Sequence, residues 1–317
     1  MRVLITGTSG MIGSSLSERL LEQGHDVIPV DRLPNRWSPV IDAMTRRVDL
    51  LDECAVETLP TDVDWVIHLA ANARVHDLVV DPRGARENMI TAFNAIELAR
   101  RAGAFCVFAS SREVYGNQGF DTYTEDLVDP EQLESPYAAS KLAGEVMLRS
   151  YGRAYGLSHC VVRFSNVYGR NDTSDRFVPI VFKRLLDERG PQPITIYGKD
   201  KSLDFTYLDD TLDGIELILN QPERANTRTF NLSRGQRATL IEAAEMIAER
   251  VGRPLELIIA DSRPGEVTHY QGDIEAARTH LGYAPSRDLW EGLHTAAAWY
   301  ADRYRHAEAD RLLPAVD

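Results

Sequence analysis

The first strand and turn of the chain restrict its fold more than any other feature. An apolar run, Arg-Val-Leu-Ile-Thr, leads directly into Gly-Thr-Ser-Gly-Met-Ile-Gly, which opens a helical pattern. In such a turn Gly7 permits a tight bend, Gly10 lets the backbone approach a pyrophosphate, and Gly13 lets the helix pack closely on a sheet. The helix N-terminus, with Met11 and Ile12, offers free N–H groups and a partial positive charge. This pattern predicts a dinucleotide-binding site.

A carboxylate closes the second predicted strand. Asp31 follows Gly13 by 18 residues, where a carboxylate can accept both ribose hydroxyls of NAD and would repel the 2′-phosphate of NADP. Arg32 comes next and could offset part of that repulsion. We therefore expect NAD as the cofactor, with Asp31 and Arg32 among the residues that bind it.

Strands and helices alternate through the first half of the chain. Strands that alternate with helices pair in parallel through right-handed crossovers, and continuous apolar strands are covered on both faces. We therefore expect an α/β chain with a doubly wound parallel Rossmann sheet. The predicted strands are residues 2–6, 26–31, 63–69, 105–110 and 158–164, and the predicted helices are 11–23, 83–102 and 136–155.

The pattern loosens after about residue 166, where Gly and Pro become frequent. Further strands are predicted at 194–197 and 229–232, and further helices at 240–251 and 289–304. We expect three parts: an NAD-binding Rossmann domain that carries the reactive site (1–166), a smaller C-terminal substrate-binding α/β lobe interleaved with it (167–305), and a polar tail (306–317).

Charge and cysteine content narrow the class of protein. The chain has 35 Lys and Arg against 48 Asp and Glu, and its net charge of −13 disfavours nucleic-acid binding. Three widely spaced cysteines argue against a zinc site or a disulfide framework and fit a reducing compartment. The N-terminus begins as a strand rather than as a signal peptide, and no apolar run has the length of a membrane span. We expect a soluble cytoplasmic protein without a bound metal.

Tyr137 and Lys141 are four residues apart in a predicted helix, so they share one face. An ammonium near a phenol favours the phenolate, lowers its pKa and lets it act as a base near neutral pH. The chain has four lysines, which makes this spacing more informative. Ser111 ends the preceding strand, and ligands in such sheets bind at the carboxyl ends of strands. We expect these three residues to form the reactive site.

Further motifs occur in a fixed order along the chain. They are TGTSGMIG at 6–13, VDLLD at 48–52, HLAA at 68–71, ENM at 87–89, ASSREVYG at 109–116, SPYAASK at 135–141, VRFSNVYG at 162–169, DFTYLDD at 204–210 and RPGEV at 263–267. This series resembles the extended short-chain dehydrogenases/reductases, specifically the NAD-dependent nucleotide-sugar epimerase/dehydratase group that includes UDP-glucose 4-epimerases. The resemblance covers nearly the whole chain, and the ordered series is highly specific.

The resemblance implies an enzyme that holds NAD tightly and regenerates it within each turnover. Tyr137 would take the proton from a sugar hydroxyl, Lys141 would lower the pKa of Tyr137 and hold the nicotinamide ribose, and Ser111 would hydrogen-bond the reacting oxygen. Further expected cofactor-binding residues are Asp49, Leu50, Leu69, Ala70, Ala71, Asn88, Ala109 and Phe164. Expected substrate-binding residues are Ser111, Arg74, Arg112, Asn166, Arg176, Val178, Tyr197 and Arg263.

The segment Ser111-Arg112-Glu113 bears on the fate of the sugar after its first oxidation. In the family that the chain resembles, 4,6-dehydratases usually carry Thr-Asp-Glu here and uronate decarboxylases Thr-Ser-Glu. An arginine, with a pKa above about 12, cannot act as the acid. This favours a 4-epimerase of a UDP-hexose or UDP-uronate. A decarboxylase or dehydratase that uses Glu113 is the alternative, and Arg112 and Glu113 could also be only an ion pair beside the pocket.

Two other classes fit less well. An NAD-binding regulatory protein without catalysis would not need Ser111, Tyr137 and Lys141, and an NADP-dependent reductase fits Asp31 poorly. Within the favoured class, Leu203 stands where many relatives have a phosphate-binding arginine, so Arg176, Lys183 or Lys201 would have to compensate.

Arg74, together with Arg112, could pair with the carboxylate of a uronate substrate. The resemblance also implies a homodimer. Leu98, Val146 and Leu148 could supply its apolar contacts, unless they face the protein's own sheet.

Overall fold

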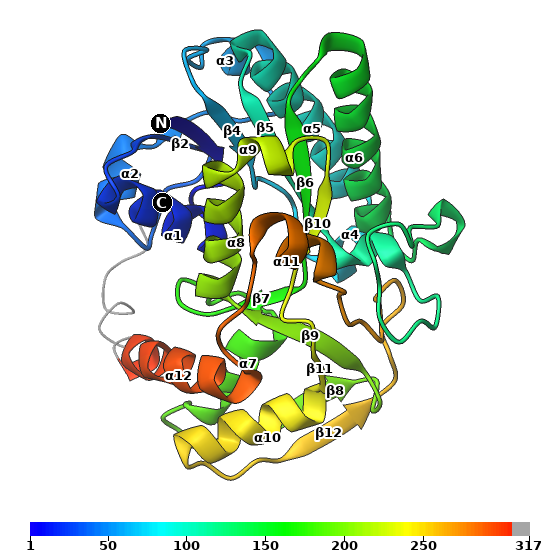
Figure 1. Cartoon of the computed structure of the whole chain (residues 1–317). Helices are drawn as coiled ribbons and strands as arrows, with labels where there is room; N and C mark the ends of the chain where they lie inside the picture. The colour runs from blue at the N-terminus through cyan, green and yellow to red at the C-terminus, as the bar shows by residue number, and fades with distance from the viewer. Residues whose placement is uncertain (306–317) are drawn as a thin grey trace.

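The structure, a computed structural model that describes residues 1–305, is built around a seven-stranded sheet (Figure 1). The strand order is β10-β6-β5-β4-β1-β2-β3, and all pairings are parallel. The chain builds outward from β1 to one edge, then returns at β4 and builds to the other edge. The strands are β1 (Arg2–Thr6), β2 (Asp26–Asp31), β3 (Arg46–Arg47), β4 (Trp65–His68), β5 (Phe105–Ser111), β6 (His159–Phe164) and β10 (Thr229–Leu232).

Helices cover both faces of this sheet because successive strand residues point to opposite sides. Val3 and Ile5 of β1 pack in one core with the apolar residues of helices on one face, while Leu4 packs in a second core with those of helices on the other face. On the first face lie α1 (Met11–Glu22), α8 (Leu208–Asn220) and α11 (Glu275–Leu281); on the second lie α5 (Arg83–Ala102) and α6 (Pro136–Tyr155). The expected doubly wound fold is confirmed.

A second, smaller lobe lies beyond the carboxyl ends of these strands, in the lower half of Figure 1. Its own apolar core joins helices, one three-stranded sheet and one two-stranded sheet. The strands are β7 (Asn166–Tyr168), β9 (Ser202–Tyr207) and β11 (Arg237–Thr239) in the first sheet, and β8 (Ile194–Tyr197) and β12 (Leu257–Ala260) in the second; the helices are α7 (Phe177–Leu185), α10 (Leu240–Val251) and α12 (Leu289–Arg305).

Short elements complete the connections: α2 (Pro39–Met44), α3 (Glu53–Glu57), α4 (Val75–Val80), α9 (Pro222–Ala225) and the 3₁₀ helices η1 (Arg112–Tyr115) and η2 (Pro130–Gln132). For three helices, 83–102, 136–155 and 240–251, the predicted first and last residues are the ones observed. Ser135 caps α6, with the N–H of Ala138 donating to its Oγ at 3.2 Å. The strand expected at 63–69 is shorter, at 65–68.

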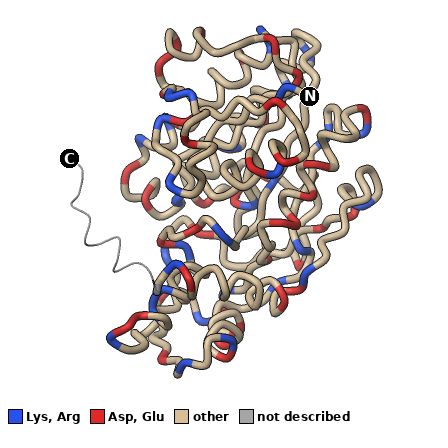
Figure 2. The backbone as a smooth tube through the Cα atoms, turned by 90° about the vertical axis from the view of Figure 1, so that its left-hand side faces the viewer, with Lys and Arg blue, Asp and Glu red and all other residues tan. Residues whose placement is uncertain are grey.

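The predicted division of the chain into domains at residue 166 stays a prediction. Strand β10, which comes from the second half of the chain, lies at one edge of the main sheet. The predicted tail, 306–317, lies outside the described residues. Among residues 1–305, no helix combines the length and apolar character needed to cross a bilayer. Acidic and basic positions are interspersed along the backbone of both lobes (Figure 2).

Candidate active site

A cleft of about 870 Å³ lies between the carboxyl ends of the main strands and the second lobe. Every catalytic, cofactor-binding and substrate-binding residue expected from the sequence lines it. These residues come from segments far apart in the chain, from Gly7 to Arg263. Parallel strands bring them together because their carboxyl ends share one edge of the sheet.

The glycine-rich turn forms a closely packed cradle at one end of this cleft. Gly7 has φ +78°, which a residue with a side chain rarely adopts. A Cβ on Gly13 would lie 2.3 Å from the carbonyl oxygen of Gly7, so only glycine lets α1 approach this closely. Gly10 begins α1 without a side-chain cap, which leaves N–H groups of the first turn available. The cradle fits the pyrophosphate of a dinucleotide.

Asp31 lies at the end of β2, beside this cradle. Its two carboxylate oxygens accept hydrogen bonds from the backbone N–H of Ser9 at 2.8 Å and of Leu33 at 2.9 Å. Each oxygen has a further lone pair for a ribose hydroxyl. Arg32 faces Asp49 at 3.6 Å, with both side chains about half exposed. The guanidinium that could offset repulsion of a 2′-phosphate is therefore paired with another carboxylate.

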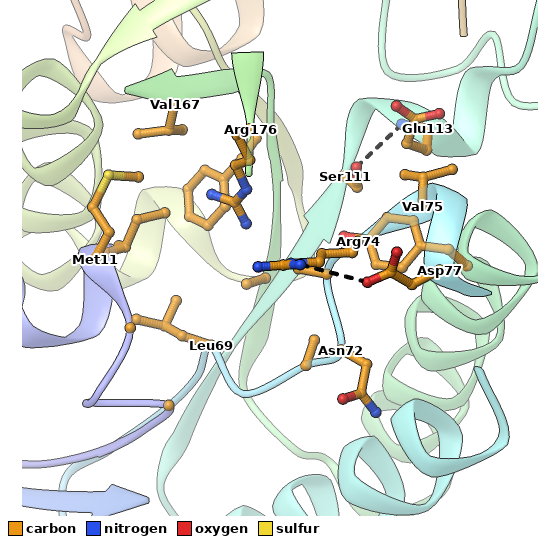
Figure 3. A pocket seen from close by; sticks show the side chains of 18 of the residues that line it. Met11, Leu69, Asn72, Arg74, Val75, Asp77, Ser111, Glu113, Val167 and Arg176 are labelled. Carbon is orange, nitrogen blue, oxygen red and sulfur yellow. Dashed lines mark hydrogen bonds and ion pairs between the residues drawn. The ribbon is translucent and has the colours of Figure 1, made fainter. Parts of the chain in front are cut away.

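Tyr137 and Lys141 project from the first turns of α6 into the middle of the cleft and are almost fully buried. The Nζ of Lys141 donates to the carbonyl oxygen of Ala109 at 2.8 Å and lies 5.9 Å from the centre of the Tyr137 ring. Ser111 hydrogen-bonds Tyr137. Its Oγ also accepts from the N–H of Glu113 at 3.2 Å, so it caps η1 as well (Figure 3).

The expected lowering of the Tyr137 pKa is wrong for this structure. Burial raises the pKa of Tyr137, and the hydrogen bond from Ser111 and the charge of Arg176 offset only part of that rise. Burial likewise lowers the pKa of Lys141 to about 8, against the opposing charge of Glu145. Desolvation disfavours the charged form of both groups, and the spacing of two residues along a helix does not measure desolvation.

Arg112 and Glu113 form a buried ion pair in the wall of the cleft, with Nη2 2.8 Å from Oε1. The same Nη2 donates to Oδ1 of Asn166 at 3.3 Å, and the N–H of Val267 donates to Oε2 of Glu113 at 3.3 Å. The ion pair considered from the sequence is therefore present. It ties η1 to β7 and to the loop that carries Arg263.

Cations on the substrate side of the cleft differ in how they are held. Arg74 and Arg176 are exposed and project into the cleft (Figure 3), and Arg74 lies 3.2 Å from Asp175 and 3.7 Å from Asp77. The guanidinium of Arg263 stacks over the ring of Tyr197, 3.8 Å from its centre. Lys201 is buried and pairs with Glu266 at 2.6 Å, whereas Lys183 is exposed on α7. The proposed uronate role of Arg74 and Arg112 stays a prediction.

Sequence reasoning missed several polar groups of the cleft, among them Asn72 and Glu87. The N–H of Asn72 donates to Oδ1 of Asn88 at 2.7 Å, and its Nδ2 donates to Glu87 at 2.9 Å. Asn88 in turn bonds Ser140 on α6 at 3.3 Å. Position alone could have indicated them, because Asn72 directly follows the HLAA motif and Glu87 begins the ENM motif.

Comparisons with known proteins agree with this geometry. The model of the NAD dependent epimerase/dehydratase family matches residues 3–233. The chain belongs to this family. The family is NAD-dependent, in agreement with the cofactor that the glycine cradle and Asp31 indicate.

Individual relatives differ in reaction. A putative UDP-glucose 4-epimerase of Methanocaldococcus jannaschii is 30% identical, over 96% of this chain and 99% of its own length. A Thermus thermophilus UDP-glucose 4-epimerase, solved with NAD, is 31% identical with a TM-score of 0.84, and the match covers 95% of this chain and 99% of that one. A UDP-glucuronic acid decarboxylase of Xenopus tropicalis is 27% identical, over 99% of this chain and 75% of its own length.

Replacing Asp31 with Asn should weaken the discrimination between NAD and NADP. The change removes the negative charge that repels a 2′-phosphate, so we expect the ratio of the two affinities to shift toward NADP by about tenfold, or about 1.4 kcal/mol. Titration calorimetry with NAD and with NADP measures the two affinities and hence their ratio. Glu22→Gln removes an exposed carboxylate at the far end of α1, outside the cleft; it is the matched control and should keep the wild-type ratio. An unchanged ratio in Asp31→Asn would contradict the assignment.

Proposed function

We propose that the protein is an NAD-dependent 4-epimerase of a nucleotide sugar, with a UDP-hexose or UDP-uronate as substrate. One observation carries this proposal. The pair Tyr137 and Lys141, with Ser111, lies in the same cleft as the glycine cradle and Asp31. A base and a dinucleotide site within one cleft can oxidise a sugar carbon and reduce it again in place.

In the proposed reaction, Tyr137 accepts the proton of the C4 hydroxyl, and Ser111 holds the same oxygen by a hydrogen bond. NAD⁺, held by the glycine turn and Asp31, would supply reversible hydride transfer at C4, so that the carbon could be oxidised and then reduced on its other face. Lys141, fixed by the carbonyl of Ala109, holds the nicotinamide ribose beside Tyr137. Reprotonation of the C4 oxygen by Tyr137 completes the turnover without net consumption of cofactor.

The remaining cleft residues divide between the two ligands. We assign the dinucleotide to the glycine turn, Asp31, Arg32 and the main-sheet residues Asp49, Leu50, Leu69, Ala70, Ala71, Asn88, Ala109 and Phe164. We assign the nucleotide sugar to Arg74, Arg112, Asn166, Arg176, Val178, Tyr197 and Arg263. Arg176 and Arg263 would face its diphosphate, which the acidic chain otherwise repels.

A decarboxylase or dehydratase is the second candidate, because Glu113 lines the same cleft. In a dehydratase this carboxylate would act with an acid at position 112. Here Arg112 holds it in an ion pair, and the N–H of Val267 binds its second oxygen. Both carboxylate oxygens are therefore occupied by partners in the cleft wall, so the geometry favours the epimerase.

Incubation with nucleotide sugars tests the proposal. Purified protein with bound NAD, and with no further cofactor added, is mixed with UDP-, GDP- and dTDP-hexoses and UDP-glucuronate. We expect a product of unchanged mass inverted at C4, identified by mass spectrometry and proton NMR. Tyr137→Phe should lower kcat by about 10²–10⁴-fold. Loss of carbon dioxide or water would overturn the epimerase assignment and move the chain to the lyases.

The pH profile provides a second test. Activity requires the Tyr137 phenolate, so kcat rises with pH through the pKa of that group. Ser111→Ala removes a hydrogen bond that opposes the burial-driven rise of this pKa, so the rising limb should move to higher pH. Ser111→Thr keeps a hydroxyl and should leave the limb in place. A Ser111→Ala profile that is lower in height but unshifted would contradict the role given to Ser111.

We also propose a homodimer that pairs through α5 and α6. Leu98 and Leu148 are buried in the chain's own core and cannot serve this interface, which corrects one expectation. Val146 is 57% exposed, and α5 adds three partly exposed apolar side chains, Met89, Ile90 and Phe93. The free cysteines Cys54, Cys106 and Cys160 support the further proposal of a cytoplasmic, reducing location.

Phe93→Asp should separate the dimer, because a charge would be desolvated at the centre of the contact. Light scattering at micromolar concentration measures the mass, with Val40→Asp on the exposed side of α2 as the control that should stay dimeric. A wild-type monomer, or a Phe93→Asp dimer, would contradict this surface.

A further inference from the structure

The carboxylate of Glu145 is completely buried one turn along α6 from Lys141. Each of its oxygens accepts two hydrogen bonds. Oε1 accepts from Ser110 Oγ at 2.6 Å and from Arg163 Nε at 2.9 Å. Oε2 accepts from Arg163 Nη2 at 2.7 Å and from Arg149 Nη2 at 2.8 Å. A carboxylate with four donors around it has one possible position.

Ser110 connects this fixed group to the reactive site. It is the penultimate residue of β5, and its two neighbours each contact a member of the catalytic pair. The carbonyl of Ala109 accepts from Lys141 Nζ at 2.8 Å, and Ser111 hydrogen-bonds Tyr137. The end of β5 thus meets α6 at three successive residues, and the bond between Ser110 and Glu145 lies between the two catalytic contacts.

We propose that Glu145 is a positioning residue: through Ser110 it holds the end of β5 against α6, so that Ala109 and Ser111 stay in register with Lys141 and Tyr137. This inference rests on the proposed function for its catalytic consequence, because a register error here would misplace the base relative to the sugar. It concerns a buried group that does not line the cleft.

The charge of Glu145 affects the pKa of Lys141, which can be measured directly. Burial would raise the pKa of Glu145, but the hydrogen bonds and charge of Arg163 outweigh it and keep the pKa below its usual range. The anion in turn opposes the burial that lowers the Lys141 pKa. The other ionisable groups that face Lys141 are Tyr137 on the same helix and His68 on β4, which burial keeps neutral.

Lysine NMR tests the electrostatic part without any substrate. The chain has four lysines, so ¹³C-labelled side chains give few signals, and Lys141 is identified by its loss in Lys141→Arg. In the wild type it should titrate near pH 8. Glu145→Gln removes the anion and leaves Arg163 uncompensated, so the midpoint should fall by about one unit. An unshifted midpoint in folded Glu145→Gln protein would overturn the proposal.

A milder variant tests the positioning part if Glu145→Gln does not fold. Ser110→Ala removes only the bond between Ser110 and Glu145, so we expect kcat to fall about tenfold with KM for the nucleotide sugar unchanged. Arg149→Met is the matched control: it removes a donor to the same carboxylate from the partly exposed side and should keep kcat within about twofold of the wild type.

The NMR titration and the kinetic variants test the electrostatic effect and the positioning role separately. Wild-type kcat in Ser110→Ala, or an equal loss in Arg149→Met, would overturn the positioning role. If no nucleotide sugar reacts with the wild-type enzyme, the proposed function fails, while the Lys141 titration in Glu145→Gln still decides whether Glu145 acts on the catalytic helix.

Discussion

The buried contact between Arg163 and Glu145 holds the main sheet, the catalytic helix and the loops above them in one arrangement. From β6, the guanidinium reaches Glu145 on α6, the hydroxyl of Tyr115 on η1 at 2.9 Å and the carbonyl of Glu125 at 2.7 Å. Tyr115 donates onward to Asn231 on β10 at 2.6 Å. Because an unpaired buried charge is strongly destabilising, these partners cannot separate independently, and the end of β5 is held among them.

Pairing also explains how an acidic protein can hold an anionic ligand. Several cations of the cleft already have carboxylate partners: Arg32 has Asp49, Arg74 has Asp175 and Lys201 has Glu266. Arg32 and Arg74 are about half exposed, whereas Lys201 is buried with its partner. The ammonium group of Lys201 is therefore held in place before a ligand binds, and a nearby phosphate or sugar carboxylate meets it without a loss of its rotamer freedom.

Local patterns in the sequence predicted the features that depend on neighbouring residues, and missed those that depend on distant ones. The glycine turn and the shared face of Tyr137 and Lys141 were predicted because each is set within a few residues. Strand β3, formed by the exposed Arg46–Arg47, has no apolar pattern to detect. The bond from Ser110 to Glu145 spans 35 residues, and the pKa of Tyr137 depends on burial, so neither could be predicted.

The identity of residue 112 connects the structure to the choice of reaction. With an acid at this position, an acid–base pair with the neighbouring Glu113 would make elimination after the first oxidation available. With arginine, the same carboxylate is neutralised in the cleft wall at 2.8 Å and η1 is tied to Asn166. Compared with an acid at position 112, arginine removes a proton donor and holds Glu113 in an ion pair. A 4-keto hexose formed here meets no free acid–base pair among Ser111, Arg112 and Glu113, which disfavours loss of water and favours reduction at C4.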